Sequence, residues 1–97
     1  MHLDFEWDEE KNGRNFKKHG IRFEEAALIF REPTLTTVDD RKDYGETRET
    51  SIGQLGGRVY LVVVHTDREG ITRLISARRA KRQERKEYDD YIKKDTG

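Results

Sequence analysis

The sequence predicts an α+β fold: an N-terminal strand and two helices, then a four-stranded antiparallel meander, and finally a C-terminal helix. Two observations predict this order. Apolar residues recur at helical spacing in the first third, and after Pro33 the pattern changes to β-branched runs separated by short polar turns. Successive strands joined by such turns are antiparallel. The length of 97 residues fits a single domain over residues 1–97.

The chain begins with a predicted strand and a first helix. In segment 3–7 apolar residues alternate with polar ones, which is typical of a short strand. Asp8 suits the N-cap of the following helix, because its carboxylate can accept hydrogen bonds from the first backbone N–H groups. The helix is expected to end at residues 18–20, where Lys18 and His19 complement the helix dipole and Gly20 suits a left-handed cap.

A second helix and the first strand of the meander follow. The helix is predicted over Phe23–Arg31, and Pro33 ends it because proline disfavours helical backbone in the residue before it. Residues 34–38 are rich in β-branched side chains and predict a strand. Residues 39–45 are polar and predict a loop.

Three more strands and a helix complete the prediction. The Gly56-Gly57 pair is a strong hairpin signal, and the apolar run at residues 62–64 predicts a strand buried on both faces. The final strand is expected to lie exposed, and together with the charged last helix it leaves room for a homodimer. The expected elements are strands at Arg48–Leu55, Arg58–Thr66 and Ile71–Ala77, and a charged helix at Ala80–Lys94.

Composition argues against several classes of protein. Cysteine is absent, so neither a disulfide framework nor a thiolate metal site is expected. The longest apolar run, Val59–Val64, is far shorter than the roughly 20 residues of a transmembrane helix. The acidic N-terminus lacks the features of a signal peptide, so we expect a cytoplasmic protein. The three histidines lack metal-ligand spacing, and no metal or cofactor is predicted. Oxygen-ligand sites stay open, because a sequence encodes them loosely.

Charge is distributed unevenly along the chain. The 20 basic and 20 acidic residues balance, yet the first 50 residues carry a net charge of −4 and the last 47 a net charge of +4. Segment 68–86 holds eight basic and two acidic residues. Such a cluster attracts polyanions, and six of its cations are arginines, whose planar guanidinium suits bidentate contacts to phosphate. A solvated helix face with ion pairs is the alternative interpretation.

RNA is one polyanion on which such residues can do chemistry. It carries its own nucleophile, the 2′-OH beside the scissile phosphate. A protein has only to align that group, accept its proton, stabilise charge on the phosphate and protonate the leaving 5′ oxygen. Arginine and lysine can supply most of this, and either can act as the base where cationic neighbours or burial lower its proton affinity.

Several short motifs, taken together and in chain order, resemble one family. They are Phe5-Glu6-Trp7-Asp8-Glu9-Glu10-Lys11, Lys18-His19-Gly20-Ile21, Phe23-Glu24-Glu25-Ala26, Gly45-Glu46-Thr47-Arg48, Thr66-Asp67-Arg68, Arg73-Leu74-Ile75-Ser76-Ala77-Arg78-Arg79-Ala80 and Glu84-Arg85-x-x-Tyr88. Each motif is weak alone. Together they cover nearly the whole chain and resemble the BrnT family.

This resemblance implies a fold, an activity and a partner. BrnT proteins are toxins of bacterial type II toxin–antitoxin pairs, with a fold similar to that of the RelE ribonucleases. The resemblance implies an endoribonuclease that needs no metal or cofactor, cleaves RNA through the 2′-OH and arrests growth. It also implies a BrnA-like ribbon-helix-helix antitoxin, with contact to operator DNA only through that antitoxin.

The resemblance further implies candidate site residues. The arginines among them would contact phosphate, Lys18 or His19 would transfer protons, and Glu84 would orient an arginine. Each role has a structural alternative. The aromatic residues could lie in the core, His19 could cap a helix, and Arg79 and Arg82 could be solvated. The catalytic candidates are Lys18, His19, Arg68, Arg78 and Glu84. The RNA-binding candidates are Trp7, Arg73, Arg79, Arg82 and Tyr88.

Three positions depart from the family pattern. Arg22 stands where the family often has Ser, His65 stands where Tyr is common, and Lys81 stands where Thr is common. A Thr at position 81 would have formed a capping box with Glu84, so the sequence leaves the start of the last helix open. The sequence therefore also leaves open the direction in which Arg78 and Arg79 point.

Other functions remain as alternatives. A non-catalytic nucleic-acid-binding module would bind through the same basic residues in a salt-dependent way and leave RNA intact. A protein-interaction subunit would use its acidic first half and basic second half for a protein partner alone. A triad of Ser76, His65 and Asp67 is set aside, because nothing in the sequence marks Ser76 as a nucleophile. The combined motifs favour the ribonuclease toxin.

Overall fold

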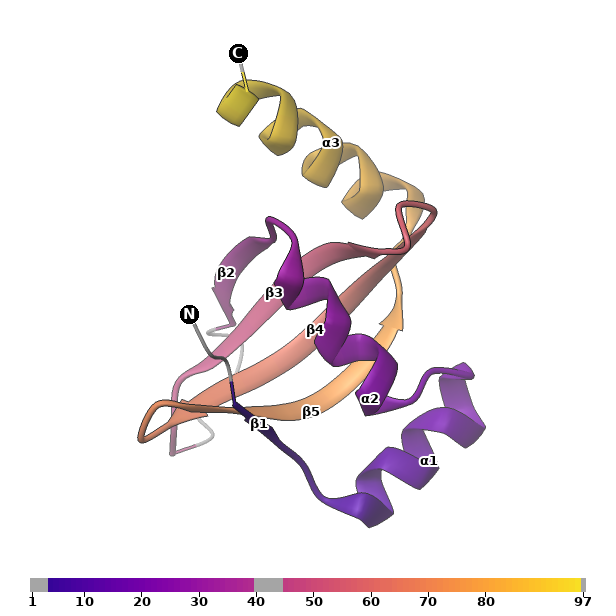
Figure 1. Cartoon of the computed structure of the whole chain (residues 1–97), viewed down its shortest axis with the longest axis vertical. Coiled ribbons are helices and arrows are strands. Elements are labelled where there is room, and N and C mark those ends of the chain that lie inside the picture. Colours follow the sequence, from indigo (N-terminus) through magenta and orange to yellow (C-terminus); the bar gives the residue numbers. More distant parts are fainter. Residues whose placement is uncertain (1–3, 40–44, 97) are drawn as a thin grey trace.

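A mixed sheet with helices packed around it forms the fold (Figure 1). The computed structural model describes residues 4–39 and 45–96. The strands are β1 (Phe5–Glu6), β2 (Leu35–Asp39), β3 (Arg48–Leu55), β4 (Val59–Arg68) and β5 (Ile71–Arg79). The helices are α1 (Glu9–His19), α2 (Phe23–Ala26), the 3₁₀ helix η1 (Ala27–Arg31) and α3 (Arg82–Thr96). The predicted α+β class is therefore confirmed, while its relation to the RelE ribonucleases stays a prediction.

The strands are arranged in the order β1-β5-β4-β3-β2. The strands from β2 to β5 pair with their sequence neighbours in antiparallel fashion, as the short turns predict. β1 pairs in parallel with β5, with Phe5 opposite Thr72. In the described part of the chain β1 and β2 are thus the sheet edges, and the expectation that the final strand is an exposed edge is wrong, because β1 pairs with Thr72 and Arg73 of β5.

The N-terminal elements are shorter than the sequence predicts. β1 spans two residues, and Leu3 of the predicted strand lies outside the described residues, as do residues 40–44 of the predicted loop. The second helix is α-helical only over Phe23–Ala26 and then tightens into η1. Such tightening is common in the last turns of a helix, where it satisfies carbonyl groups that would otherwise lack a partner.

β5 is longer than predicted and the last helix begins later. The strand continues to Arg79 rather than ending at Ala77, because its pairing with β4 continues until Arg79 lies opposite Leu61. The Ala80 N–H then donates to the carbonyl oxygen of Tyr60 at 2.9 Å. The junction between β5 and α3 is therefore short and fixed by backbone hydrogen bonds.

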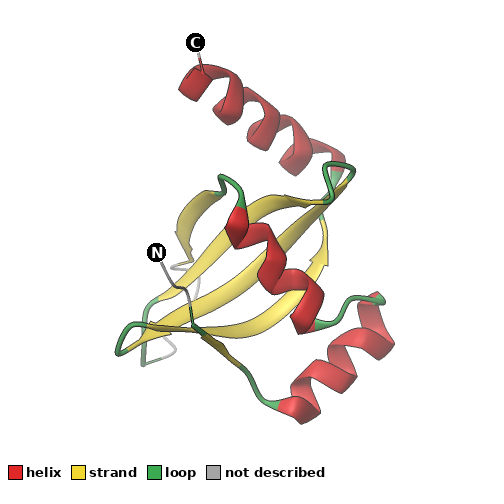
Figure 2. Ribbon diagram, in the orientation of Figure 1, coloured by secondary structure: helices red, strands yellow, loops and turns green. Residues whose placement is uncertain are grey.

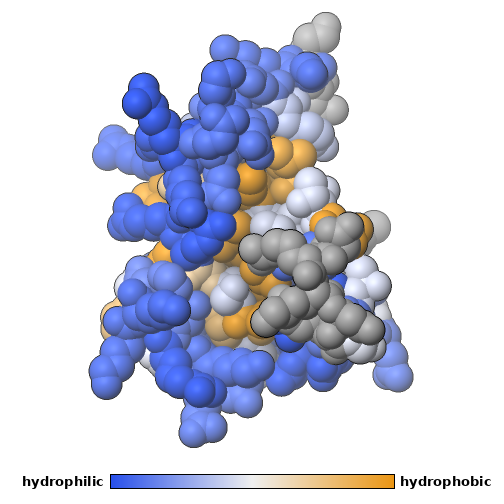
Figure 3. Space-filling view, turned by 180° about the vertical axis from the view of Figure 1, so that it is seen from behind, coloured by the Kyte–Doolittle hydropathy of each residue, from blue (hydrophilic) through white to orange (hydrophobic). Residues whose placement is uncertain are grey.

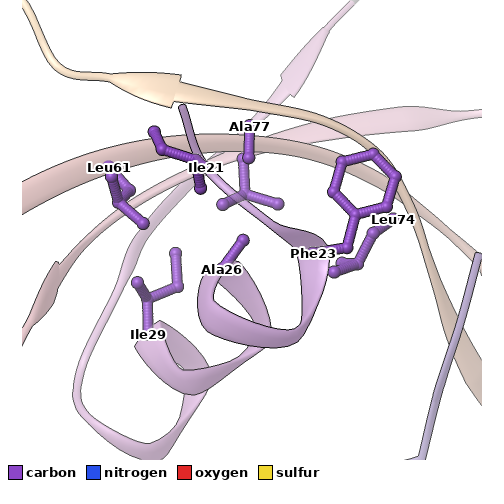
Figure 4. Packing of buried hydrophobic residues seen from close by; sticks show 8 residues of the cluster. Ile21, Phe23, Ala26, Ile29, Leu61, Leu74 and Ala77 are labelled. Carbon is purple, nitrogen blue, oxygen red and sulfur yellow. The ribbon is translucent and has the colours of Figure 1, made fainter. Parts of the chain in front are cut away.

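The main core lies on one face of the sheet, beneath α2 and η1 (Figures 2 and 4). We call this the helix-covered face. Apolar side chains of alternate strand residues meet those of the helices there and are almost fully buried, so this contact is the main hydrophobic contribution to stability. The buried members are Ile21, Phe23, Ala26, Ile29, Leu61, Val63, Leu74 and Ala77.

Asn15 attaches α1 to the outer edge of β5. Its side-chain amide donates to the carbonyl oxygens of Ile21 and Ala77, at 2.9 Å each, and its side-chain oxygen accepts from the Ala77 N–H at 3.1 Å. The side chain thus pairs with β5 as a neighbouring strand would, beyond the point where β1 ends.

Neither α1 nor any other helix of the described residues is long and apolar enough to cross a membrane.

The opposite face of the sheet is only partly covered. A smaller core joins Ile52 and Val62 to Tyr88 of α3, which lies across one end of this face. Tyr88 is 3% exposed and its hydroxyl donates to the Pro33 carbonyl oxygen at 2.8 Å. Seen from this side, apolar atoms remain visible in the middle of the face, framed by hydrophilic surface (Figure 3).

Candidate nucleic-acid interface

Among the residues that the structure describes, the part of the second face that α3 leaves open is a groove of about 410 Å³. We call this side of the sheet the groove face. Val62 and Val64, on alternate positions of β4, belong to its lining, and α3 closes one side through Glu84. The other lining residues are Thr37, Val38 and Asp39 of β2, Thr50 of β3, and Ser76 and Arg78 of β5.

Arg78 and Glu84 form the best-defined polar pair of this groove. The two terminal nitrogens of Arg78 donate to the two carboxylate oxygens of Glu84, at 2.8 Å each. The Arg78 side chain stays 38% exposed. A bidentate pair of this kind fixes the plane of the guanidinium, so Arg78 is presented to the groove in a defined orientation.

Glu84 also determines where α3 starts. Its carboxylate accepts from the Lys81 backbone N–H at 2.8 Å, and the Lys81 carbonyl accepts the first helical bond, from the Arg85 N–H. This hydrogen bond is one half of a capping box. The other half needs a side-chain acceptor at position 81, which Lys81 lacks, yet the helix still begins at Arg82. The hydrogen bonds from Arg78, with smaller help from Lys81, lower the pKa of Glu84 to about 2.

Two more arginines continue from Arg78 along the β4–β5 hairpin, each with a carboxylate. Strand alternation places Arg68 on the groove face, and Arg73 lies opposite Thr66 on that same face. Arg73 contacts Glu6 at 2.9 Å and Arg68 contacts Glu46 at 3.2 Å. Neither acidic partner could be predicted from the sequence, because both are distant from the arginines along the chain and only the sheet brings them together.

Arg68 and Arg78 do not share one phosphate site. Arg78 lies opposite Val62, and Arg68 is six residues further along β4. At roughly 3.3 Å per residue the two positions are about 20 Å apart. The basic segment 68–86 is therefore not one cluster in space, and the hairpin register excludes contact of both arginines with a single phosphate.

The remaining basic candidates lie on other surfaces. Arg79 is exposed and follows Arg78 on β5, so alternation directs it away from the groove. Arg82 lines a second hollow of about 670 Å³ between α3 and Tyr60. Lys18 and His19 occupy the last turn of α1, next to the left-handed cap at Gly20 (φ 73°). Among the described residues neither makes a hydrogen bond or ion pair with Arg78 or Glu84.

The two aromatic candidates are packed against other rings. Trp7 meets Phe23 edge to face, with centroids 6.2 Å apart, and its indole N–H donates to Glu9. Tyr88 meets Tyr60 edge to face at 5.8 Å, and its burial raises the pKa of its hydroxyl. Both rings have a clear packing role in this structure, and RNA binding by either one stays a prediction.

His65 and Ser76 lie on opposite faces, so they cannot act together. His65 is buried on the helix-covered face, where its Nε2 lies 2.7 Å from the Ser51 hydroxyl and its ring meets Phe30 edge to face. Burial lowers the pKa of His65. In the described part of the chain no three His, Asp or Glu side chains gather as a metal-binding group.

An α+β fold with an arginine-bearing groove on one sheet face defines a small protein suited to bind a polyanion. A family model described as "Ribonuclease toxin, BrnT, of type II toxin-antitoxin system" matches residues 7–84. The chain belongs to this family, which implies an antitoxin partner and an RNA target.

A solved structure supports the same relationship. The chain is similar to the Brucella abortus ribonuclease toxin BrnT, with 25% sequence identity and a TM-score of 0.64. The similarity covers 84% of this chain and 100% of the Brucella chain. A search of curated protein sequences gave no match.

Proposed function

We propose that this toxin cleaves RNA through the 2′-OH, without a metal, and that the groove face binds the RNA. The observation that carries the proposal is Arg78, held by Glu84 at 2.8 Å in two hydrogen bonds and still 38% exposed. Its guanidinium also donates to the Arg79 carbonyl oxygen at 3.3 Å, and its exposed part can bind a phosphate and stabilise the charge that develops there.

The reaction requires little beyond this positioning. The 2′ oxygen loses its proton and attacks the neighbouring phosphorus, the bond to the 5′ oxygen breaks, and that oxygen takes up a proton. The products are a 2′,3′-cyclic phosphate and a 5′-OH. Lys18 and His19 are proposed for the proton transfers on the family resemblance alone. Arg73, with Arg68 beyond it, would contact phosphates further along the strand, since both line the same face.

The proposed partner is a ribbon-helix-helix antitoxin of the BrnA type, through which the complex would bind operator DNA. Family membership supports an antitoxin, and the resemblance supports this kind. A homodimer stays a possibility through the charged helix α3 alone, since β5 pairs with β1 and is not an edge strand.

RNA cleavage by the purified protein tests the proposal. We expect a short RNA to be cut in the presence of EDTA, with 2′,3′-cyclic phosphate and 5′-OH ends, and the same RNA with 2′-deoxy sugars to stay intact. Loss of cleavage in EDTA that is restored by a divalent cation would contradict the metal-free mechanism. Salt-sensitive binding of RNA that stays intact would instead identify a non-catalytic binding module.

A further inference from the structure

The groove carries polar groups that the phosphate chemistry does not use. Thr50 of β3, Val64 of β4 and Ser76 of β5 lie in direct register, so they form one row across three strands. All three line the groove. In the adjacent row Val62 lies opposite Arg78. The groove therefore combines an apolar floor, two flanking hydroxyls and a phosphate-binding guanidinium beside them.

These hydroxyls differ from those on the helix-covered face. There, Ser51 lies 2.7 Å from both the Thr36 hydroxyl and His65, so its hydrogen-bonding capacity is used inside the protein. The side chains of Thr50 and Ser76 make no such hydrogen bond within the described residues. Both are half-buried and reachable from the groove. They are thus available to a ligand.

The charges at the rim give the groove a direction. Arg78 and Asp39 line it on opposite sides of the Thr50–Val64–Ser76 row, since Arg78 pairs with Val62 and Asp39 pairs with Arg48. A phosphate is attracted to the Arg78 side, whereas on the other side the charge of Asp39 is offset by Arg48 directly opposite it. A base attached to a phosphate at Arg78 is within reach of Val64, which lies in the adjacent row between the two hydroxyls.

We propose that the groove is a base-recognition subsite for one nucleotide of single-stranded RNA. Val64 contacts the face of the base, and the hydroxyls of Thr50 and Ser76 hydrogen-bond to its edge. The groove volume of about 410 Å³ lies near the lower end of the range, roughly 300–1,000 Å³, of small-molecule sites. Proteins that read RNA sequence do so mainly on unpaired bases, through such edge contacts. The inference rests on the proposed function, because it places the base beside the reacting phosphate.

The test removes each hydroxyl while keeping the side-chain shape. Purified Thr50→Val and Ser76→Ala variants are compared with the unaltered toxin on a random-sequence RNA pool, and the bases flanking each cut are counted. We expect RNA to be cut still, with a roughly two- to tenfold change in base preference at one position beside the cut, the effect of one lost hydrogen bond. Thr72→Val, on β5 but on the opposite face, serves as the matched control and keeps the original preference.

A second measurement separates failure of this inference from failure of the proposed function. Binding of trinucleotides with 2′-O-methyl sugars, which cannot be cut through the 2′-OH, is measured for the same proteins. Cleavage and binding with unchanged base preference in both variants would overturn the inference and leave the ribonuclease intact. Loss of antitoxin binding with unchanged base preference would overturn it in favour of a protein partner in the groove. Base-selective binding without any cleavage would keep the subsite and overturn the ribonuclease.

Discussion

Glu84 performs two structural tasks with one carboxylate: it holds the guanidinium of Arg78 and accepts the Lys81 N–H at the start of α3. The hydrogen bonds from Arg78 are the main cause that lowers the pKa of Glu84 to about 2. The ionised carboxylate is therefore favoured in the folded state. Its stabilisation is complete above the unfolded pKa of 4.5 and is lost as the pH falls from there towards 2.

The Glu84→Gln variant tests this coupling. We expect its free energy of unfolding to fall less steeply below about pH 4.5 than that of the unaltered protein, because the titrating group has been removed. Urea unfolding at a series of acidic pH values measures the difference. Equal pH dependence in the two proteins would show that Glu84 is not held in its ionised form.

Gly53 makes room for the core at a single point. A Cβ at this position would lie 2.9 Å from the Cβ of Ile29, which is fully buried. We expect Gly53→Ala to lower the free energy of unfolding by about 1–3 kcal/mol, the usual effect of overpacking. Gly13→Ala is the control, since nothing lies near its added methyl group. That change should stabilise α1 by about 0.5–1 kcal/mol, and equal effects at both positions would contradict the packing argument.

At the scale of elements, α1 depends on Asn15. Because its amide pairs with both backbone groups of Ala77, Asn15→Ala leaves a buried N–H and carbonyl groups without their partner. We expect a loss of about 2–3 kcal/mol in unfolding free energy, and faster hydrogen exchange at the Ala77 amide. Lys17→Ala, exposed on the same helix, should change stability by less than about 0.5 kcal/mol. An unchanged exchange rate at Ala77 would contradict this account of how α1 is attached.

The order of the elements and most of their ranges could be predicted from the sequence, because the signals are local. Gly56-Gly57 marks a hairpin, and Asp8 and Gly20 lie at the two ends of α1 as their cap preferences indicate. The start of α3 could not be predicted in this way. It depends on Glu84 bridging to the N-cap backbone and to a strand residue, and only the packed junction creates that contact.

At the scale of the whole molecule, the two faces of the sheet serve different purposes. One face carries the main core, while the other exposes the groove and the arginines that lie along the β4–β5 hairpin. The Arg78–Glu84 pair could be predicted from the sequence, since the two residues are close in the chain. The separation of Arg68 from Arg78 could not be predicted, because it follows from the hairpin register. The row formed by Thr50, Val64 and Ser76 could not be predicted for the same reason.

The arginines along the hairpin predict a salt-dependent affinity for single-stranded RNA. Arg73→Ala should weaken RNA binding equally for all sequences and reduce the slope of log K against log salt by about 0.7, the effect of one lost phosphate contact. Titrations at several salt concentrations measure this slope. An unchanged slope would mean that Glu6 holds Arg73 for structural reasons alone.

The central claim is that Arg78 is the phosphate-binding residue of an RNA-cleaving toxin. The most direct measurement is expression in bacteria with and without the antitoxin, reading growth and RNA 5′ ends together, for the unaltered chain, Arg78→Ala and Arg14→Ala. Arg14→Ala is the control, because it removes the same charge from an exposed position on α1. We predict growth arrest with new RNA ends for the unaltered chain and Arg14→Ala, relieved by the antitoxin, and neither effect for a folded Arg78→Ala protein. Arrest and RNA cleavage by Arg78→Ala at the level of the unaltered toxin would contradict the account.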